Sequence, residues 1–152
     1  MDYYRKFAHE LSAGEGYEPS SFLITAEVNQ QFLFSIEDYC EDYLYRPNGP
    51  NPIVHPMLLL HMSARTRSRS FRLAPNTGSI FAKEKVIFRR PALVDEPLST
   101  TWTIRDVYEK NGRLYQHLDI QVCGEDDVVI DREMHSVFFT KGVRMTAPEV
   151  NS

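Results

Sequence analysis

Hydrophobic and polar residues follow two different periods along the chain, and the change comes near residue 79. Before it, residues 57–64 are apolar almost all the way round a helix, a pattern that is typical of a buried helix. Pro56 suits the first helical position, where its missing N–H is not needed, and the sequence APNTG at 74–78 stops the helix. We therefore expect a central helix over residues 56–72, whose second half carries arginines and emerges into solvent.

From residue 79 onward, apolar and polar positions alternate, which is the period of a β-strand. Turn sequences separate the alternating segments, and Asn111-Gly112 is the strongest hairpin signal among them. The positions expected on one face are Ile80, Ala82, Val86 and Phe88, then Leu98, Thr100, Trp102 and Ile104, then Leu114, Leu118, Ile120 and Val122, and finally Val128, Ile130, Met134 and Phe138. An antiparallel meander after a buried helix predicts an α+β fold in which a curved sheet wraps around the helix.

The N-terminal part of the chain is less regular. Residues 1–20 are polar and are expected to form a lead-in, with a short helix at 3–12. Residues 21–34 are expected to hold a short strand and then a helix that opens near Thr25. We therefore divide the chain into a lead-in (1–20), a single domain (21–142) and a C-terminal tail (143–152).

Composition restricts the classes of function. The chain has 152 residues, of which 42% are hydrophobic, and this is enough for one packed domain. The net charge of -4 argues against a nucleic-acid binder. No apolar run approaches the roughly 18–20 residues that span a bilayer, the first residues have no secretory h-region, and the two cysteines have no metal-ligand spacing. We expect a soluble cytoplasmic protein that binds neither nucleic acid nor a membrane.

Three segments, in this order, resemble those of a known family. FLFSIEDY (32–39) resembles the segment that leads to the family's catalytic Asp, and PIVHPMLL (52–59) resembles its P-I-[AV]-H-G-M-L at the start of the central helix. VIFRRPALVDEPLSTTWTI (86–104) resembles the next signature, a strand followed by Pro and then Gly-Asp-x-Leu. Over roughly residues 20–140 the chain is similar to the MaoC-like (R)-specific enoyl-thioester hydratases and dehydratases, which implies the hotdog fold.

The chain differs from the family at defined positions. The family's catalytic segment reads D-x-N-P-x-H, and the corresponding stretch here is DYCEDY, so that Asp38 keeps the acid and Tyr43 stands where the His belongs. Pro56 replaces a Gly whose N–H is thought to hold the thioester carbonyl, and Asp95-Glu96 stands where Gly-Asp is usual. The resemblance therefore implies the fold and the substrate class, with an altered catalytic segment.

Hydration of an enoyl thioester needs a donor for the enolate oxygen, and an acid or base for the water and the α-proton. Because a helix N-terminus offers unpaired N–H groups and a positive dipole, we expect the N–H groups of Met57 and Leu58 to bind the thioester oxygen. His55 at the N-cap is the expected base, since the dipole favours its neutral imidazole. Asp38 would orient His55 or share the proton work, and Tyr43 would donate a hydrogen bond.

Each of these residues also has a purely structural interpretation. His55 could be only a helix cap and packing residue. Asp38 lies in an acidic run, and such runs are usually solvated surface. Tyr43 could belong to the core or to a dimer contact.

The arginines that follow the apolar segment have two interpretations as well. Arg65, Arg69 and Arg72 would share a helix face at spacings of four and three. They would then form either a solvated helix end or a site for the phosphates of coenzyme A, or for an acidic carrier-protein helix.

The leading hypothesis is a lyase that hydrates enoyl thioesters, or dehydrates 3-hydroxyacyl thioesters, of coenzyme A or acyl carrier protein. The reaction needs no metal or redox cofactor. The substrate is carried by coenzyme A or phosphopantetheine. We expect a homodimer or higher oligomer, since the outer face and edges of the sheet need covering. The alternatives are a hotdog enzyme that isomerises or cyclises a thioester-bound intermediate, and a non-catalytic partner subunit of a heteromeric dehydratase.

Overall fold

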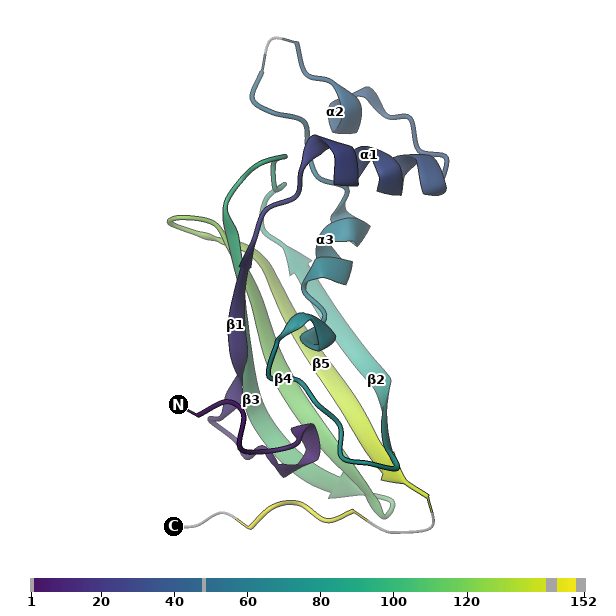
Figure 1. Cartoon of the computed structure of the whole chain (residues 1–152), viewed down its shortest axis with the longest axis vertical. Helices are drawn as coiled ribbons and strands as arrows, with labels where there is room; N and C mark the ends of the chain where they lie inside the picture. The colour runs from purple at the N-terminus through teal and green to yellow at the C-terminus, as the bar shows by residue number, and fades with distance from the viewer. Residues whose placement is uncertain (1, 48, 142–144, 150–152) are drawn as a thin grey trace.

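The computed structural model describes residues 2–47, 49–141 and 145–149, and within them a single antiparallel sheet wraps around a short helix. The sheet has the strand order β1-β3-β4-β5-β2. Its strands are β1 (Gly16–Phe22), β2 (Thr77–Phe88), β3 (Leu98–Lys110), β4 (Arg113–Cys123) and β5 (Val128–Thr140). The helix α3 (Pro56–Met62) lies against the concave face, and α1 (Ala26–Ser35) and α2 (Glu41–Leu44) sit beyond one end of the sheet (Figure 1). This is the α+β architecture that the sequence predicts.

The meander follows the predicted pattern through β3 and β4. Asn111 and Gly112 have φ values of 53° and 74°, which is the left-handed pair that a tight two-residue hairpin turn requires. The inner-face positions predicted for these two strands are all buried: Leu98, Thr100, Trp102, Ile104, Leu114, Leu118, Ile120 and Val122. The alternating period therefore identified the inner face of the central strands correctly.

The prediction for β2 is wrong at its first half, because the strand carries a β-bulge. Its register with β5 shifts around Ala82, which has no partner in the pairing. Ile80 pairs with Val137 and Val86 pairs with Arg132, and positions 137 and 132 of β5 face opposite sides of the sheet. Ile80 therefore lies on the outer face, where it is 55% exposed. An extra residue in one strand reverses the alternation on one side of it.

The central helix is shorter than the predicted 56–72. It ends at Met62, with Ser63 as its C-cap, and a short 3-10 turn at Arg65–Arg67 follows. The sheet supplies the reason: Arg132 donates to the Leu60 carbonyl, and the Trp102 indole donates to the Ser63 carbonyl. Side chains of the sheet thus satisfy carbonyls that a longer helix would have used for its own next turn.

The N-terminal segment differs from the prediction, because the helix expected at 3–12 is only a 3-10 turn at Ala8–Glu10. β1 begins at Gly16, inside the segment expected to be a lead-in, and a Cβ at this position would lie 2.2 Å from the Trp102 carbonyl oxygen. The predicted helix start at Thr25 is confirmed, since the Thr25 hydroxyl accepts a hydrogen bond from the Val28 N–H. Residues 142–144 and 150–152, which include the predicted boundary and half of the tail, lie outside the described residues, as do 1 and 48. The division into domain and tail stays a prediction.

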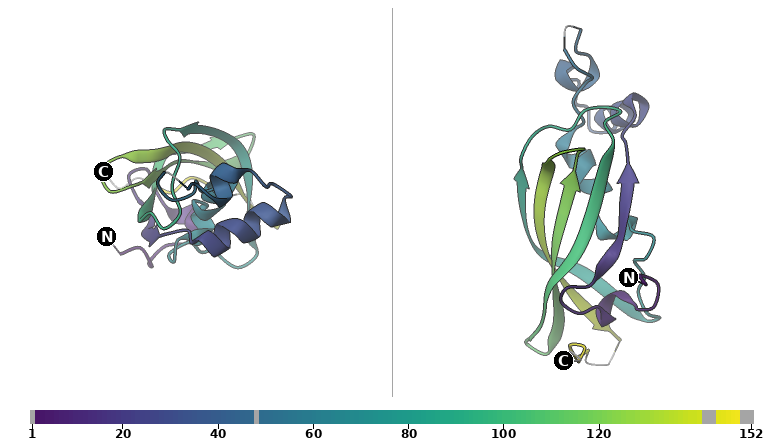
Figure 2. Two further views of the ribbon diagram at one scale, coloured as in Figure 1. Left: turned by 90° about the horizontal axis from the view of Figure 1, so that it is seen from above. Right: turned by 90° about the vertical axis from the view of Figure 1, so that its left-hand side faces the viewer.

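The strands curve around α3, as the two further views of the ribbon show (Figure 2). Two hydrophobic clusters fill the concave face. The first surrounds Leu58 and Leu59 of α3, and it includes Val122 and Ile130 from the sheet. The second contains Trp102, Leu118 and Phe138 together with Ala8, Leu11 and Tyr17 from the N-terminal segment. One end of the sheet is thus covered by α3 and the other by the N-terminal segment. Among the described residues, no helix has the length and apolar character needed to cross a bilayer.

Candidate functional site

His55 and Asp38, which lie seventeen positions apart in the sequence, meet at the N-terminal end of α3. The Nε2 atom of His55 is 3.5 Å from Oδ2 of Asp38. Asp38 follows α1, and its other carboxylate oxygen accepts a hydrogen bond of 3.0 Å from the Cys40 N–H. The two side chains are 14% and 31% exposed, respectively, so both are sheltered without being sealed from solvent. The structure therefore brings together the pair that the sequence proposed as the acid and base.

The hydrogen bonds of His55 assign its tautomer. Its Nδ1 accepts a hydrogen bond of 3.1 Å from the Met57 N–H, which makes His55 the side-chain cap of α3. In a neutral imidazole one nitrogen accepts and the other carries the hydrogen, so the hydrogen lies on Nε2 and faces Asp38. In this arrangement Asp38 is the acceptor and His55 is the donor. The expected role of His55 as the base, with Asp38 orienting it or sharing the proton work, stays a prediction.

Tyr43 stands beside the pair. It belongs to α2, and its ring centroid lies 5.1 Å from that of His55, with the Phe32 ring at 5.2 Å on the same histidine. Burial raises the pKa of the Tyr43 phenol, and the negative charge of Asp38 raises it further. The phenol therefore stays protonated at neutral pH and can donate a hydrogen bond.

Asn29 holds this arrangement in place, and sequence reasoning missed it. The residue is 1% exposed on α1, and its side-chain oxygen accepts a hydrogen bond of 3.0 Å from the His55 N–H. Its side-chain nitrogen donates to the carbonyls of Tyr43 and Ile53. A signal was present, because Asn29 and Leu33 are spaced by four residues on the buried face of α1. A polar residue in such a row needs a specific partner.

The expected helix donors are only partly available. The Met57 N–H is donated to His55, so it does not point at a substrate in this arrangement. Leu58 is 5% exposed and packs into the first hydrophobic cluster. The binding of a thioester oxygen by the Leu58 N–H stays a prediction.

A cavity of about 480 Å³ lies between α2, the start of α3 and the segment after β2, and neither His55 nor Asp38 is among its lining residues. Val54 and Pro56, the two sequence neighbours of His55, both line it, and so does Tyr43. Much of the remaining wall is apolar and includes Ile53, Leu59, Phe88 and Ala92. A hydrocarbon chain would fit such a wall because it exposes few polar groups that need a partner.

The three arginines of the predicted helix face do not form a cluster. Arg65 lies in the 3-10 turn and is 7% exposed, so it is turned into the protein. Arg69 is exposed, and Arg72 donates to the carbonyls of Tyr4 and Lys6 at the N-terminal segment. The prediction of a shared helix face is wrong because α3 ends before any of the three residues. Their proposed contact with phosphates stays a prediction.

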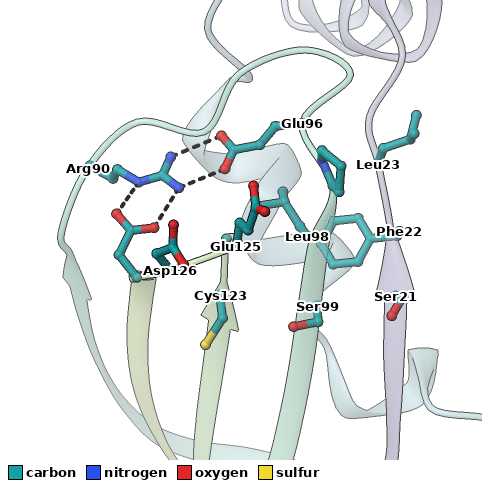
Figure 3. Close-up of a pocket in the computed structure, with 13 residues that line it drawn as sticks. Ser21, Phe22, Leu23, Arg90, Glu96, Leu98, Ser99, Cys123, Glu125 and Asp126 are labelled. Carbon is teal, nitrogen blue, oxygen red and sulfur yellow. Dashed lines mark hydrogen bonds and ion pairs between the residues drawn. The ribbon is translucent and has the colours of Figure 1, made fainter.

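A larger groove, of about 1030 Å³, lies between the ends of β1, β3 and β4 and the turn before β5 (Figure 3). Its basic residue, Arg90, is held by two carboxylates, with Glu96 at 2.7 Å and Asp127 at 2.6 Å. These bonds raise the pKa of Arg90 and lower the pKa of both acids. Arg90 is therefore engaged within the protein, and neither His55 nor Asp38 lines this groove.

Metal ligands are not gathered at either place. Among residues 2–47, 49–141 and 145–149, no three side chains of His, Cys, Asp and Glu are close enough to share a metal ion. The two cysteines, Cys40 and Cys123, are both free.

Solved structures resemble most of the chain. A MaoC-like dehydratase from Rhodospirillum rubrum matches with a TM-score of 0.70 and 13% sequence identity, over 91% of this chain and 99% of that one. The (R)-hydratase from A. caviae involved in PHA biosynthesis matches with a TM-score of 0.65 and 18% identity, over 85% and 98%. The HadBC (3R-hydroxyacyl-ACP dehydratase) complex from Mycobacterium tuberculosis matches with a TM-score of 0.64 and 13% sequence identity, over 85% of this chain and 98% of that one.

These likenesses show that the chain has the hotdog fold, as the sequence resemblance implied. No protein family and no curated protein matches the sequence. At identities of 13–18% a structural likeness establishes the fold alone, and the same fold can carry different functions. The activity therefore has to be argued from the site.

Proposed function

We propose that this protein is a lyase of the MaoC-like type, which adds water to an enoyl thioester or removes it from a 3-hydroxyacyl thioester. The observation that supports this most is the contact between Asp38 and His55, whose neighbours Val54 and Pro56 line a largely apolar cavity. A carboxylate acceptor and an imidazole donor side by side are the groups that positioning and deprotonating a water require. The apolar wall would take the acyl chain.

One water molecule can contact both groups. The two atoms are 3.5 Å apart, so a water placed to one side can lie at about 2.8 Å from each. The His55 Nε2–H would donate to the water oxygen and orient it. Asp38 would accept a proton from the water as its oxygen forms a bond to C3, and would then give that proton to C2. Dehydration follows the same steps in reverse, so the Asp38 carboxyl group alone takes up and returns the proton in both directions.

The enolate oxygen needs a donor of its own. The Tyr43 hydroxyl suits this role because it lines the cavity and its raised pKa keeps the proton on the phenol. In this proposal Tyr43 replaces the helix N–H of Met57, which His55 already occupies. No step requires a metal or redox cofactor.

The substrate class is an acyl thioester of coenzyme A or acyl carrier protein, and the protein acts as a homodimer or higher oligomer. The edges of the sheet support association, because β1 and β2 each have one unpaired side. On β2, Ile80, Phe81, Ile87 and Phe88 are between 38% and 55% exposed. A second copy of the chain would cover this apolar edge.

Two other functions keep the same fold. Isomerisation or cyclisation of a thioester-bound intermediate is favoured by Tyr43, which gives the site a donor instead of the second base that the family carries. A non-catalytic subunit is favoured by the same residue, and one of the similar structures, HadBC, is a complex of different chains. A stable homodimer in solution would argue against the subunit, and aggregation of the isolated chain would favour it.

The test is the loss of enoyl absorbance when short and medium enoyl thioesters of coenzyme A and carrier protein are hydrated. We expect turnover by the wild type and its loss in Asp38→Asn, which keeps the shape of the side chain and removes the base. Glu41→Gln, at a neighbouring exposed acid of α2 that does not line the cavity, is the matched control and should keep turnover. A folded wild type with no turnover on either carrier would reject the hydratase. Equal activity in the two variants would reject the role of Asp38.

A further inference from the structure

Two arginines point into the concave face, and they differ in what surrounds them. Arg132 of β5 has a side chain that is 10% exposed, and its Nε forms an ion pair with Glu84. Its Nη1 donates to the Leu60 carbonyl at 3.0 Å and to the Ser63 hydroxyl at 2.8 Å. This cation therefore has an anionic partner and further acceptors beside it.

Arg65 is as deeply buried and lacks such a partner. Its guanidinium lies over the rings of Phe71 and Phe138, at 5.0 and 5.5 Å, and one nitrogen donates to the Ser79 hydroxyl. The Nη1 atom has no hydrogen-bond partner within the described residues. Burial lowers the pKa of Arg65, and the Tyr17 phenol is the ionisable group that acts against this. No described carboxylate forms an ion pair with this guanidinium.

The polar groups around Arg65 carry no negative charge at neutral pH, and one of them is the Tyr17 hydroxyl, which interacts with the guanidinium. Tyr17 donates to the Gln116 side chain at 3.2 Å, and Gln116 donates in turn to the Ala8 carbonyl at 3.0 Å. Ser136 stands directly opposite Gln116, on β5, is fully buried, and its hydroxyl has no partner in the described chain. Ser136 lies one inward-facing position along β5 from Phe138, the residue over which Arg65 sits. The region around Phe138 thus holds the unpaired Arg65 Nη1 and the unpaired Ser136 hydroxyl, and also His9, whose ring lies 6.5 Å from that of Phe138 and whose Nδ1 has no partner among the described residues.

Such a region is rare in a folded protein, because more than nine in ten buried polar groups have a hydrogen-bond partner. A buried charge is more costly still when no opposite charge compensates it. Water could satisfy the free N–H groups but would leave the positive charge uncompensated. A small anion would satisfy both, since it accepts hydrogen bonds from the guanidinium and from a serine hydroxyl.

We infer that a small monovalent anion, a halide or a short carboxylate, binds inside the protein between Arg65 and Ser136. The anion would do for Arg65 what Glu84 does for Arg132. The site lies beyond the C-terminal end of α3, away from His55 and Asp38, and it does not depend on the proposed lyase activity. Its expected effect is on the stability of the fold.

The test in solution is thermal unfolding at constant ionic strength, with chloride or formate replacing the bulky anion gluconate. If the folded state binds the anion and the unfolded chain does not, Tm rises with its concentration. Above the dissociation constant, we expect the Tm of the wild type to rise by roughly 3–5 °C for each tenfold increase in chloride or formate. A Tm that does not change when chloride or formate replaces gluconate would overturn the proposal.

Two variants separate this site from general salt effects. Arg65→Gln removes the buried charge and should abolish the difference between chloride and gluconate. Arg69→Gln removes an exposed arginine of the same segment and should keep the full difference. An equal anion dependence in Arg65→Gln and the wild type would place the anion elsewhere and overturn the proposal.

If Arg65→Gln does not fold, crystals of the wild type grown in bromide decide the matter. We expect an anomalous scattering peak in contact with the Nη1 atom of Arg65. Density for a water molecule without anomalous signal at this position, or an empty position, would overturn the inference. Ser136→Ala gives a second comparison, because it removes one donor and should weaken the binding of bromide without removing the charge.

Discussion

The polar side chains at the two ends of α3 differ in their exposure to solvent and in their ion pairs. At the N-terminal end, the His55 and Asp38 side chains are 14% and 31% exposed, and the residues on both sides of His55 line a cavity. Beyond the C-terminal end, Arg132 and Arg65 are enclosed by the sheet, and only Arg132 has its opposite charge. The two regions therefore differ in solvent access. The first is open enough for a substrate to enter and leave, whereas the second could hold only an enclosed ligand.

Both ends also explain why such a short helix is stable. An isolated helix of seven residues would not form in water, because nucleation costs more than so few hydrogen bonds return. Here the His55 ring accepts the Met57 N–H at one end, and Arg132 donates to the Leu60 carbonyl at the other. The helix therefore depends on side chains that come from outside it.

The largest expected effect separates the two roles of His55. Asparagine is among the best N-cap residues, so His55→Asn should preserve the cap and change the free energy of unfolding by less than about 1 kcal/mol. It removes the imidazole donor, and turnover on enoyl thioesters should fall by about 10³- to 10⁴-fold, the upper range for such a group. Parallel measurement of urea unfolding and of kcat/KM checks both statements.

His61→Asn is the control for this experiment, since His61 is an exposed histidine of the same helix. It should retain both stability and turnover. If His55→Asn kept its turnover, His55 would be a helix cap alone. The chemistry would then have to be assigned to Asp38 without it.

The next effect compares the two buried arginines through the free energy of unfolding. Arg132→Gln leaves the Glu84 carboxylate buried without its cation, and losing one partner of a buried pair typically costs about 3–5 kcal/mol. Arg65→Gln removes a charge that has no carboxylate partner, so it should cost clearly less in the absence of chloride. Urea unfolding in gluconate measures both. Equal costs for the two variants would contradict the difference drawn between the two arginines.

The sequence predicted the parts of the fold that local pattern controls. The alternation through β3 and β4 and the Asn111-Gly112 turn depend on neighbours within a few residues, and they were correct. Motif resemblance supplied Asp38, and the chemistry of a helix N-terminus supplied His55, but neither gave the distance between the two side chains. These features are short-range, or they are carried by a recognisable motif.

The features that the sequence did not predict depend on partners far away in the chain. The end of α3 is set by Arg132 and Trp102, both more than thirty residues later, and no helix propensity reflects them. The extra residue at Ala82 becomes a bulge only in the pairing with β5. The buried position of Arg65 follows from the early end of the helix, so this error was a consequence of the first one.

Replacement of Asn29 tests whether this buried residue keeps His55 and Tyr43 in the positions that turnover needs. Asn29→Ala removes three hydrogen bonds to main-chain groups of His55, Tyr43 and Ile53, and should cost about 2–3 kcal/mol because these groups are left buried. If the positions of His55 and Tyr43 matter for chemistry, kcat should fall more than the change in KM explains.

The comparison for Asn29 is Gln31→Ala on the exposed side of α1, which should change neither quantity. Asn29→Asp keeps the acceptor for the His55 N–H and loses the two donors, so it should restore part of the activity. A variant Asn29→Ala with normal kcat and only reduced stability would make Asn29 a structural residue without influence on the site.

The smallest effect concerns the neighbourhood of Arg65 at high pH. Burial raises the pKa of Tyr17 to about 12 from the usual value near 10, so the folded state holds this proton more tightly than the unfolded chain does. The resulting stability is complete below pH 10 and is lost as the pH rises from 10 towards 12. By pH 11 the loss relative to pH 9 should be about 1.4 kcal/mol, one pKa unit of difference.

Tyr17→Phe should remove this part of the pH dependence in urea unfolding, whereas Tyr39→Phe, which removes an exposed phenol, should keep it. An unchanged slope in Tyr17→Phe would mean that Tyr17 loses its proton as easily in the folded protein as in the unfolded chain, and that the interior around Arg65 is wetter than its burial implies.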